Sequence, residues 1–194
     1  MKQGYTAFGH LNENSSMVKV HDKYFEPYLK EATIRARVGE IGAHISADYS
    51  DKKPLLIGIL NGSFVFAADL FRSLTIDAEI SFIKLASYKG TSTTGHVVTA
   101  IGLEEQLAGR HIIIVEDIID TGKTLHSFLP EVHNRQAASV AIATFLTKPA
   151  ALRYDVKADY CAFEIEDKFV VGYGLDYDGY GRNLPDLHMI REEG

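Results

Sequence analysis

The sequence is poor in several features that mark other classes of protein. Its single cysteine, Cys161, cannot form an internal disulfide, so we expect a reducing compartment, the cytoplasm. No apolar run approaches the roughly 20 residues needed to cross a bilayer, and the N-terminus is too polar for a secretory signal. Basic residues are not in excess, because the formal net charge is -6. We therefore expect neither a membrane nor a nucleic-acid partner.

Three widespread site motifs are also missing. No GxGxxG follows a predicted strand, and the eight histidines show no HExxH or similar ligand spacing, so neither a dinucleotide site nor a zinc site is indicated. Gly122-Lys123-Thr124 resembles the end of a P-loop, but GxxxxGK[ST] needs a glycine where this chain has Asp117. A carboxylate there would oppose the phosphates, so we exclude a P-loop.

The chain is organised around residues 110–125, which read RHIIIVEDIIDTGKTL. Ile112 to Val115 form an apolar, β-branched run typical of a strand buried on both faces of a parallel sheet. Glu116 and Asp117 follow where such a strand should leave the sheet. After a turn-like segment, apolar residues at spacings of three and four predict a helix; they are Leu125, Phe128, Leu129 and Val132.

A strand, an acidic loop and a helix N-terminus in this order predict a phosphate cradle with two carboxylates beside it. Helix capping is an equally simple role for Asp120, Thr121 and Thr124, and it stays open. Capping explains Glu116 and Asp117 less well. Burying a carboxylate at the end of an apolar strand costs on the order of several kcal/mol unless the carboxylate is paired or solvated. Since strand neighbours point to opposite sides, we expect one carboxylate to face the ligand and the other to be held by the protein.

The flanking segments predict a mostly parallel twisted sheet flanked by helices. An amphipathic helix is predicted over residues 30–48, with its apolar face formed by Ile34, Val38, Ile41 and Ile45. Residues 55–60 and 138–146 predict buried strands, and Phe64, Ala67, Ala68 and Phe71 suggest a helix between them. Strands that alternate with helices imply βαβ units. With 194 residues, the chain is long enough for one domain with a small added lobe.

The two ends of the chain predict this small lobe, a hood. Residues 1–24 read as a polar extension, and residues 25–29 as a short edge strand, because Pro27 cannot donate to a central ladder. Short strands without helices are predicted near 160–163, 169–173 and 187–190, so we place the core at about 30–150 and the hood at 25–29 plus 151–194. Ser87 and Tyr88 begin a loop rich in hydroxyls and glycine, and strand 97–101 returns from it, which suggests a flap.

The segment VEDIIDTGKTL resembles the phosphoribosyl-pyrophosphate motif of type I phosphoribosyltransferases, most closely the hypoxanthine-guanine phosphoribosyltransferases. The resemblance covers most of the chain from Phe25 onward and includes IRARVGEIGAHISADY, LIGILNGSFVFAADL, KLASYKGTSTTG and FEIEDKFVVGYGLDYDGYGRNL. It implies the type I phosphoribosyltransferase fold. It also implies transfer of 5-phosphoribosyl from phosphoribosyl pyrophosphate to a 6-oxopurine base, hypoxanthine or guanine, giving the purine nucleoside monophosphate and pyrophosphate. Mg²⁺ is the implied cofactor, and a homodimer or homotetramer the implied assembly.

By this resemblance, the central stretch binds the sugar phosphate. Glu116 and Asp117 would bind the ribose hydroxyls, directly or through a metal. The 5-phosphate would be wrapped by backbone N–H groups and hydroxyls of one loop, formed by Asp120, Thr121, Gly122, Lys123 and Thr124. Asp120 would also reach the purine N7 as general acid or base.

The resemblance assigns the remaining site residues to the base, the metal and the pyrophosphate. Lys148 would donate to the purine 6-oxo group, Phe169 would stack on the ring, and the backbone near Val170 and Asp176 would read its edge. Asp176, together with Glu116 and Asp117, would hold the metal. Without the resemblance, Lys148 reads as a solvated lysine, Phe169 and Val170 as core residues, and Asp176 as a turn residue.

The pyrophosphate contacts would be Arg182 and the loop at Asn61 and Gly62. Many relatives carry lysine where this chain has Asn61, so we expect altered affinity for phosphoribosyl pyrophosphate with activity retained. Three alternatives stay open at this point: a xanthine-preferring enzyme of the same branch, a phosphoribosyltransferase-like regulator that binds nucleotides and RNA, and a structural α/β module whose acidic residues are only caps.

Overall fold

The computed structural model describes residues 17–88 and 97–191. Its main sheet has six strands in the order β5-β4-β3-β6-β7-β8. They are β3 (Leu55–Leu60), β4 (Glu79–Tyr88), β5 (Val97–Ile101), β6 (His111–Ile119), β7 (Ser139–Thr147) and β8 (Tyr160–Glu164). Among these described strands, only β5 runs antiparallel to its neighbour. The predicted α/β fold with a mostly parallel sheet is confirmed.

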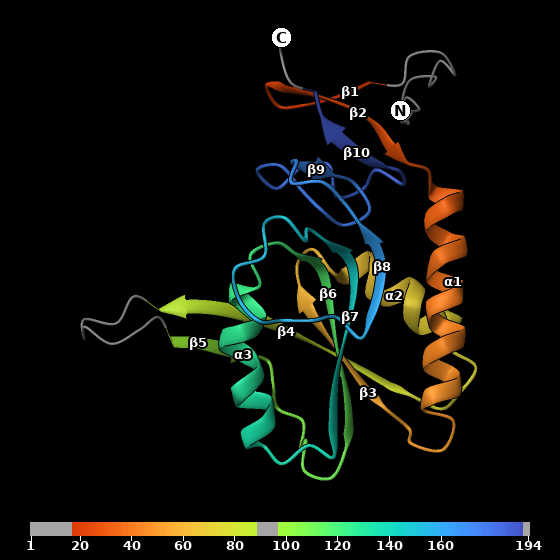
Figure 1. The fold of residues 1–194 in the computed structure, drawn as a ribbon, viewed down its shortest axis with the longest axis vertical. Helices are drawn as coiled ribbons and strands as arrows, with labels where there is room; N and C mark the ends of the chain where they lie inside the picture. Colours follow the sequence, from red (N-terminus) through yellow and green to blue (C-terminus); the bar gives the residue numbers. More distant parts are fainter. Residues whose placement is uncertain (1–16, 89–96, 192–194) are drawn as a thin grey trace, which may run out of the picture.

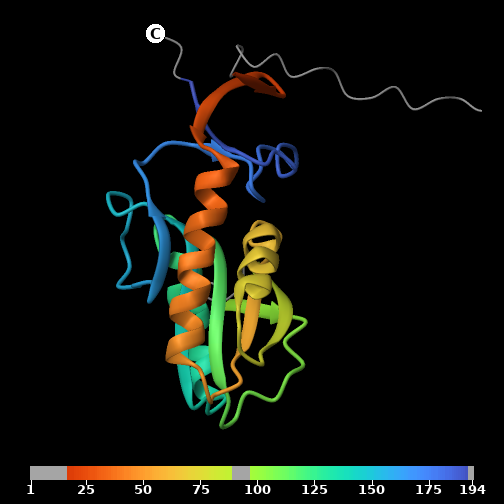
Figure 2. The ribbon, with the colours of Figure 1, turned by 90° about the vertical axis from the view of Figure 1, so that its right-hand side faces the viewer.

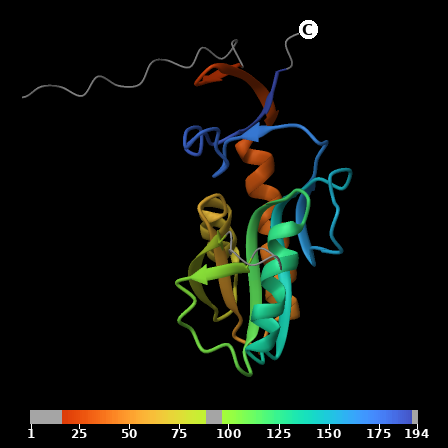
Figure 3. The same cartoon turned by 90° about the vertical axis from the view of Figure 1, so that its left-hand side faces the viewer.

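Helices cover both faces of the main sheet. Figure 2 shows α1 (Glu31–Asp48) on one side with α2 (Phe64–Ser73), and Figure 3 shows α3 (Lys123–Asn134) on the other. The side chains of β6 alternate accordingly, because Ile113 and Val115 pack in the α1–α2 core while Ile112 and Ile114 pack in the α3 core. The predicted buried face of α1 is confirmed, since Ile34, Val38, Ile41 and Ile45 are all buried.

A second, antiparallel sheet forms the hood above the main sheet (Figure 1). Its order is β1-β2-β10-β9, with β1 (Val18–Val20), β2 (Lys23–Leu29), β9 (Val170–Val171) and β10 (Leu187–Ile190). The hood is tied to the first turn of α1, because Asp186 accepts hydrogen bonds from the backbone N of Glu31 at 2.8 Å and from Lys30 Nζ at 2.9 Å. The ends of the chain therefore build the small lobe, as predicted.

Two predicted boundaries of the hood are wrong. We expected a structureless extension through residue 24, but β1 and β2 begin at Val18 and Lys23 because Val20 and Phe25 bury against Val171; residues 1–16 lie outside the described chain. We also placed residues 160–163 in the hood, but β8 joins the main sheet parallel to β7. The crossover from β7 to β8 contains no helix, which is why the sequence suggested that the chain leaves the sheet.

Two further elements differ from expectation near the site. Strand β6 does not end at Glu116 but continues to Ile119. Its pairing with β3 ends at Val115, whereas Ile118 and Ile119 still pair with β7. Helix α2 buries Phe66, Ala67 and Leu70, so only Ala67 of the four residues that suggested this helix is fully buried, and Phe64 is exposed.

The predicted flap strands exist, but the flap tip falls outside the described chain. Strands β4 and β5 pair antiparallel, as predicted. The backbone of Ser87 and Tyr88 belongs to β4, paired with Val98 and Val97, rather than to a loop. The rest of the predicted loop, residues 89–96, lies outside the described residues, so its closure over a ligand stays a prediction.

Candidate active site at the carboxyl edge of the main sheet

The central stretch lines a cavity at the end of the main sheet that faces the hood. Strands β6, β7 and β8 point toward the hood in Figure 1, so their carboxyl ends meet there. Residues 116–125 line a cavity of about 270 Å³, and they include the end of β6, the turn and the start of α3. This is the edge at which open parallel sheets bind ligands.

Glu116 carries a buried carboxyl oxygen that has no protein partner. Its side chain is buried and its Oε2 makes no hydrogen bond. Burial, followed by the nearby charge of Asp117, raises the pKa of Glu116 well above its usual value. Because buried oxygens are normally paired, Oε2 is free to bind a hydroxyl or a cation that enters the cavity.

Asp117 is held by its surroundings instead. Its Oδ1 accepts a hydrogen bond from the backbone N of Ile118 at 2.8 Å, and its carboxylate lies so close to Gly62 that a Cβ there would overlap it. Burial raises the pKa of Asp117, while backbone N–H groups and the charge of Arg182 oppose the rise. The two neighbouring carboxyls thus differ: Asp117 is held by the protein, and one oxygen of Glu116 is unpaired. That Glu116 faces the ligand stays a prediction.

The turn after β6 leaves α3 without a side-chain cap. Gly122 is the N-cap residue, with φ of 80° in the left-handed region that favours glycine, and no side chain caps the helix. Thr121 Oγ1 only accepts a long hydrogen bond, 3.3 Å, from the backbone N of Lys123. Capping therefore does not explain Asp120 and Thr124, while Thr121 makes one long bond to the first residue of α3. A helix start with so little side-chain capping suits an anion.

Lys148, the predicted donor to the purine 6-oxo group, lies next to the predicted phosphate loop. It follows β7, its side chain is only 8% exposed, and its Nζ lies 3.9 Å from Asp120 Oδ2 and 3.3 Å from Asp167 Oδ1. Lys148 is therefore not a solvated lysine. Asp167 is a residue that sequence reasoning missed, because only the folded chain brings it to Lys148, and no local pattern singles it out.

Phe169 presents an aromatic ring at the base of the hood. It is 44% exposed, and its ring lies 6.3 Å from that of Phe25 and 5.7 Å from that of Tyr177. Val170 follows it in β9, is buried, and pairs with Met189 of β10. An exposed ring held by aromatic neighbours and a rigid strand can stack on a planar ligand.

Asp176 and Arg182 pair with each other beside the loop at Gly62. Arg182 Nη2 lies 2.6 Å from Asp176 Oδ1, and Asp176 Oδ2 accepts from the backbone N of Gly179 at 2.7 Å. Arg182 Nη1 also donates to the carbonyl of Gly174 at 2.7 Å, and Gly174 lies against the carbonyl of Gly62. The structure thus brings the predicted pyrophosphate residues Gly62 and Arg182 to one place, while the neighbouring Asn61 is exposed.

The three predicted metal ligands do not form a ready-made metal cage. Among the described residues, no group of three or more His, Cys, Asp or Glu side chains could hold a metal ion. Both oxygens of Asp176 have protein partners, and Oε2 of Glu116 has none. Such a set of hard oxygens fits Mg²⁺ that is held mainly by substrate oxygens and water, with few protein ligands.

An uncapped helix start beside buried carboxyls, at the carboxyl edge of an open α/β sheet, places the protein among the α/β proteins that bind phosphorylated ligands. Comparison with known families makes this more specific. The family described as "Phosphoribosyl transferase domain" matches residues 26–178. The chain belongs to the phosphoribosyltransferases, in the hypoxanthine-guanine branch defined by its relatives.

Relatives and solved structures agree on this branch. A hypoxanthine-guanine phosphoribosyltransferase of Streptococcus pneumoniae is 43% identical over 79% of this chain and 86% of its own length. A hypoxanthine-guanine-xanthine phosphoribosyltransferase of Tritrichomonas foetus is 37% identical over 82% of this chain and 87% of its own. The crystal structure of a Staphylococcus aureus hypoxanthine phosphoribosyltransferase superposes with a TM-score of 0.80 and 36% identity, covering 86% of this chain and 91% of that one.

The comparisons agree with the predicted fold and do not favour the xanthine-preferring or regulatory alternatives. Among the described residues, no helix is both long enough and apolar enough to span a membrane.

Proposed function

We propose that the protein salvages purines by transferring 5-phosphoribosyl from phosphoribosyl pyrophosphate to hypoxanthine and guanine. The products are IMP or GMP and pyrophosphate. The observation that carries this proposal is the approach of Lys148 Nζ to Asp120 Oδ2, 3.9 Å, at the mouth of the phosphate loop. It supports a site in which Lys148, as the donor to the 6-oxo group, and Asp120, as the acceptor of the purine proton, face the same ligand.

The cavity lined by residues 116–125 is the proposed site of the ribose 5-phosphate. Glu116 and Asp117 bind the ribose hydroxyls there, and the unpaired Oε2 of Glu116 supports this role. The 5-phosphate accepts hydrogen bonds from the N–H groups at the start of α3 and from the hydroxyls of Thr121 and Thr124. Only the long hydrogen bond from Lys123 N to Thr121 Oγ1, 3.3 Å, engages a side chain at that helix start, which supports its role as an anion site.

Asp120 is the proposed proton acceptor. As purine N9 bonds to C1′ of the ribose, the C1′–O bond to pyrophosphate breaks, and the proton on N7 passes to Asp120. The Asp120 side chain is 50% exposed, so an incoming base can reach it. Lys148 donates to the 6-oxo group, Phe169 stacks on the ring, and Arg182 binds the leaving pyrophosphate together with the loop at Gly62.

Mg²⁺ is the proposed cofactor, with Asp176, Glu116 and Asp117 as the side chains that would face it. When bound, it neutralises charge on the pyrophosphate oxygens. In the free protein Asp176 and Arg182 pair with each other. This pair supports an exchange on binding, in which Arg182 would turn to the pyrophosphate and Asp176 to the cation. We also propose a cytoplasmic homodimer or homotetramer, from the family resemblance and the free Cys161; light scattering tests the assembly.

A panel of bases tests the proposed reaction. The protein is mixed with phosphoribosyl pyrophosphate, Mg²⁺ and each of hypoxanthine, guanine, xanthine, adenine and uracil, and pyrophosphate release is followed. We expect turnover with hypoxanthine and guanine and none with adenine or uracil. A xanthine rate above the other two would favour the xanthine-preferring alternative. No turnover with any 6-oxopurine would contradict the proposal.

A further inference from the structure

Tyr173 joins the hood segment to helix α2 through one partly buried hydrogen bond. Its hydroxyl donates to Asp69 Oδ2 at 2.8 Å, and its ring packs against Phe145 with 4.7 Å between centroids. Burial, and then the bond to Asp69, raises the pKa of Tyr173 far above its ordinary value. The hydroxyl therefore keeps its proton and stays a donor.

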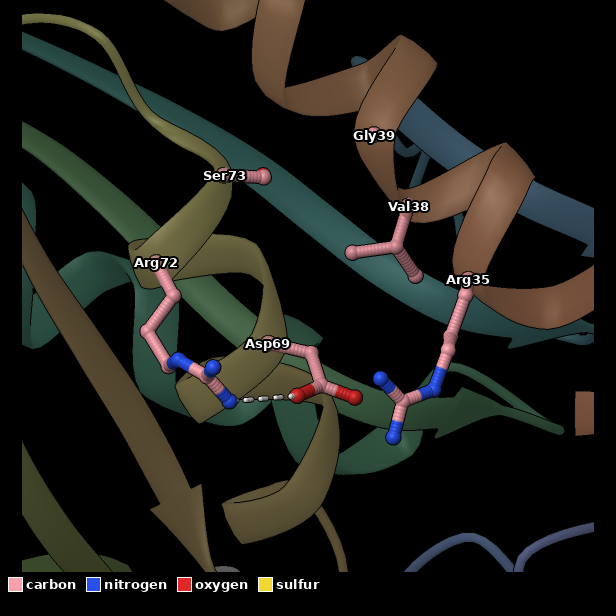
Figure 4. Close-up of a pocket in the computed structure, with 6 residues that line it drawn as sticks. All are labelled: Arg35, Val38, Gly39, Asp69, Arg72 and Ser73. Carbon is pink, nitrogen blue, oxygen red and sulfur yellow. Dashed lines mark ion pairs between the residues drawn. The ribbon is translucent and has the colours of Figure 1, made fainter. Parts of the chain in front are cut away.

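Two arginines flank the acceptor of this bond (Figure 4). Arg72 Nη1 lies 3.7 Å from Asp69 Oδ1, and the guanidinium of Arg35 points at the carboxylate from the other side. Together they line a pocket of about 200 Å³ between α1 and α2. Positive charge thus lies on two sides of Asp69, and a hydrogen bond to an ionised carboxylate is stronger than one between neutral groups.

The backbone around Tyr173 adopts a conformation that needs an anchor. Gly172, Tyr173 and Gly174 have φ of 103°, 48° and 101°. Positive φ is uncommon for a residue with a bulky side chain. The side-chain bond to Asp69 and a backbone bond from Tyr173 N to the carbonyl of Leu184, 2.8 Å, both hold this turn.

The turn leads directly to the proposed pyrophosphate contacts. The carbonyl of Gly174 accepts from Arg182 Nη1 at 2.7 Å. A Cβ at Gly174 would overlap the carbonyl oxygen of Gly62, so the turn and the pyrophosphate loop touch. That loop runs into α2, the helix that carries Asp69. The Tyr173–Asp69 bond therefore connects α2, which follows the loop at Gly62, to the turn at Gly174, which binds Arg182.

We propose that Tyr173 and Asp69 are positioning residues for phosphoribosyl pyrophosphate. Their hydrogen bond sets the distance between Arg182 and the loop at Gly62, so that both reach the same pyrophosphate, and neither residue touches the substrate. This inference rests on the proposed function. It deepens that function by assigning part of the affinity for phosphoribosyl pyrophosphate to a bond outside the substrate cavity.

Tyr173→Phe tests the proposal because it removes only the hydroxyl and leaves the ring packed on Phe145. We expect the KM for phosphoribosyl pyrophosphate to rise roughly tenfold, the change that follows from losing one hydrogen bond to a charged group. We expect kcat at saturating substrates to change by less than about threefold. An unchanged KM for phosphoribosyl pyrophosphate in an active, folded variant overturns the proposal.

Tyr160→Phe is the matched control. Tyr160 also donates to an aspartate, Asp48 on α1, at 2.7 Å, but it anchors the edge strand β8 and makes no contact with the pyrophosphate residues. We expect this variant to lower the melting temperature and to leave the KM for phosphoribosyl pyrophosphate within about twofold of the wild type. An equal KM rise in both variants overturns the proposal, because it indicates general loosening.

A double-mutant cycle with Asp69→Ala completes the test. The two single variants should raise the KM by similar factors, and the double variant should raise it no further, because both remove the same bond. Additive effects overturn the proposal. If Tyr173→Phe does not fold, the KM of Asp69→Ala for phosphoribosyl pyrophosphate decides alone. A raised KM supports the proposal, and an unchanged KM overturns it. Wild-type protein without turnover would contradict the proposed function instead, so the two failures are distinguishable.

Discussion

Two neighbouring units of the main sheet have the same design and different chemistry. In each of them a buried parallel strand ends at the carboxyl edge, turns, and enters a helix: β3 into α2, and β6 into α3. The first turn is filled by protein. Ser63 Oγ donates to the carbonyl of Ile59 at 2.7 Å, and Gly62 is pressed between Asp117 and Gly174. The second turn borders the cavity of about 270 Å³.

The difference comes from the residues that end each strand. At β6 the carboxyls of Glu116 and Asp117 and the left-handed Gly122 open a polar space in front of an uncapped helix. At β3 the small residue Gly62 lets Asp117 and Gly174 approach the turn closely. Neither helix start has a side-chain cap, so it is the polar cavity in front of α3, and not the missing cap, that makes the second turn the candidate anion site.

The largest effect is expected in the open turn, from Asp120→Asn. The amide keeps the size of the side chain but cannot accept the purine proton, so kcat should fall by roughly 10² to 10⁴. Binding of phosphoribosyl pyrophosphate, measured by calorimetry, should change far less, and the melting temperature should stay within a few degrees. An unimpaired kcat would rule out proton transfer by Asp120.

The next effect is expected in the filled turn, from Gly62→Ala. Its Cβ would overlap the carboxylate of Asp117, so the side chain must move and the proposed ribose contact is displaced. We expect a loss of roughly 1–3 kcal/mol in stability and a KM for phosphoribosyl pyrophosphate raised more than about tenfold.

Gly109→Ala is the control for backbone effects. Gly109 has φ of 73°, no other atom lies within 4 Å of the position that an alanine Cβ would take, and the residue precedes β6, away from the cavity. This variant should lose stability through backbone strain alone and keep the wild-type KM. A Gly62→Ala enzyme with wild-type KM would show that close packing at the first turn has no part in substrate binding.

Glu116→Gln should stabilise the free protein, because the carboxyl is buried with an unpaired oxygen. The folded protein holds the Glu116 proton more tightly than the unfolded chain, whose pKa is near 4.5. Unfolding therefore releases a proton, and wild-type stability falls as pH rises from about 4.5 toward the higher folded-state pKa. Glu116→Gln lacks this loss, so its advantage should grow across that window to roughly 1–3 kcal/mol.

Denaturant unfolding at pH 4 to 8 measures this advantage. Glu131→Gln, which breaks a partly exposed pair with Arg135 at the end of α3, should change stability by less than about 1 kcal/mol. A pH-independent difference between Glu116→Gln and wild type would mean that folding does not raise the pKa of Glu116.

The smallest effect is expected at the exposed edge of the filled turn, from Asn61→Lys. A lysine there adds one solvent-screened charge near the pyrophosphate, so affinity for phosphoribosyl pyrophosphate should rise about two- to fivefold with turnover retained. Steady-state kinetics at two salt concentrations measure the change. If both binding and turnover are unchanged, the side chain at this position has no role in the loop.

The sequence predicted the elements with long, regular patterns. The apolar face of α1, strand β3 and the helix after Gly122 were predictable because burial repeats over several turns or fills a whole strand. The three-residue β1 was not predicted, and β8 was predicted as a strand but placed in the wrong sheet, because backbone pairing with distant partners leaves no residue pattern. Strand β6 was predicted too short, since its last residues pair only with β7.

The candidate site was predictable where it follows a motif and hidden where it depends on distant contacts. Residues 116–124 lie together because they are consecutive at one strand end. The contacts of Lys148 with Asp167 and of Tyr173 with Asp69 join residues 19 and 104 positions apart. Neither Asp167 nor Asp69 stands out in the sequence, because the neighbours of a single aspartate do not reveal its distant partner.

The central claim is that the turn between β6 and α3, rather than the turn between β3 and α2, holds the 5-phosphate. An NMR titration of the protein with GMP, and separately with guanosine, tests it by following the backbone amides of both turns. We predict large shifts for residues 121–124 with GMP that are absent with guanosine, and small shifts for Gly62 and Ser63 with either ligand. Phosphate-dependent shifts confined to Gly62 and Ser63 would contradict the account.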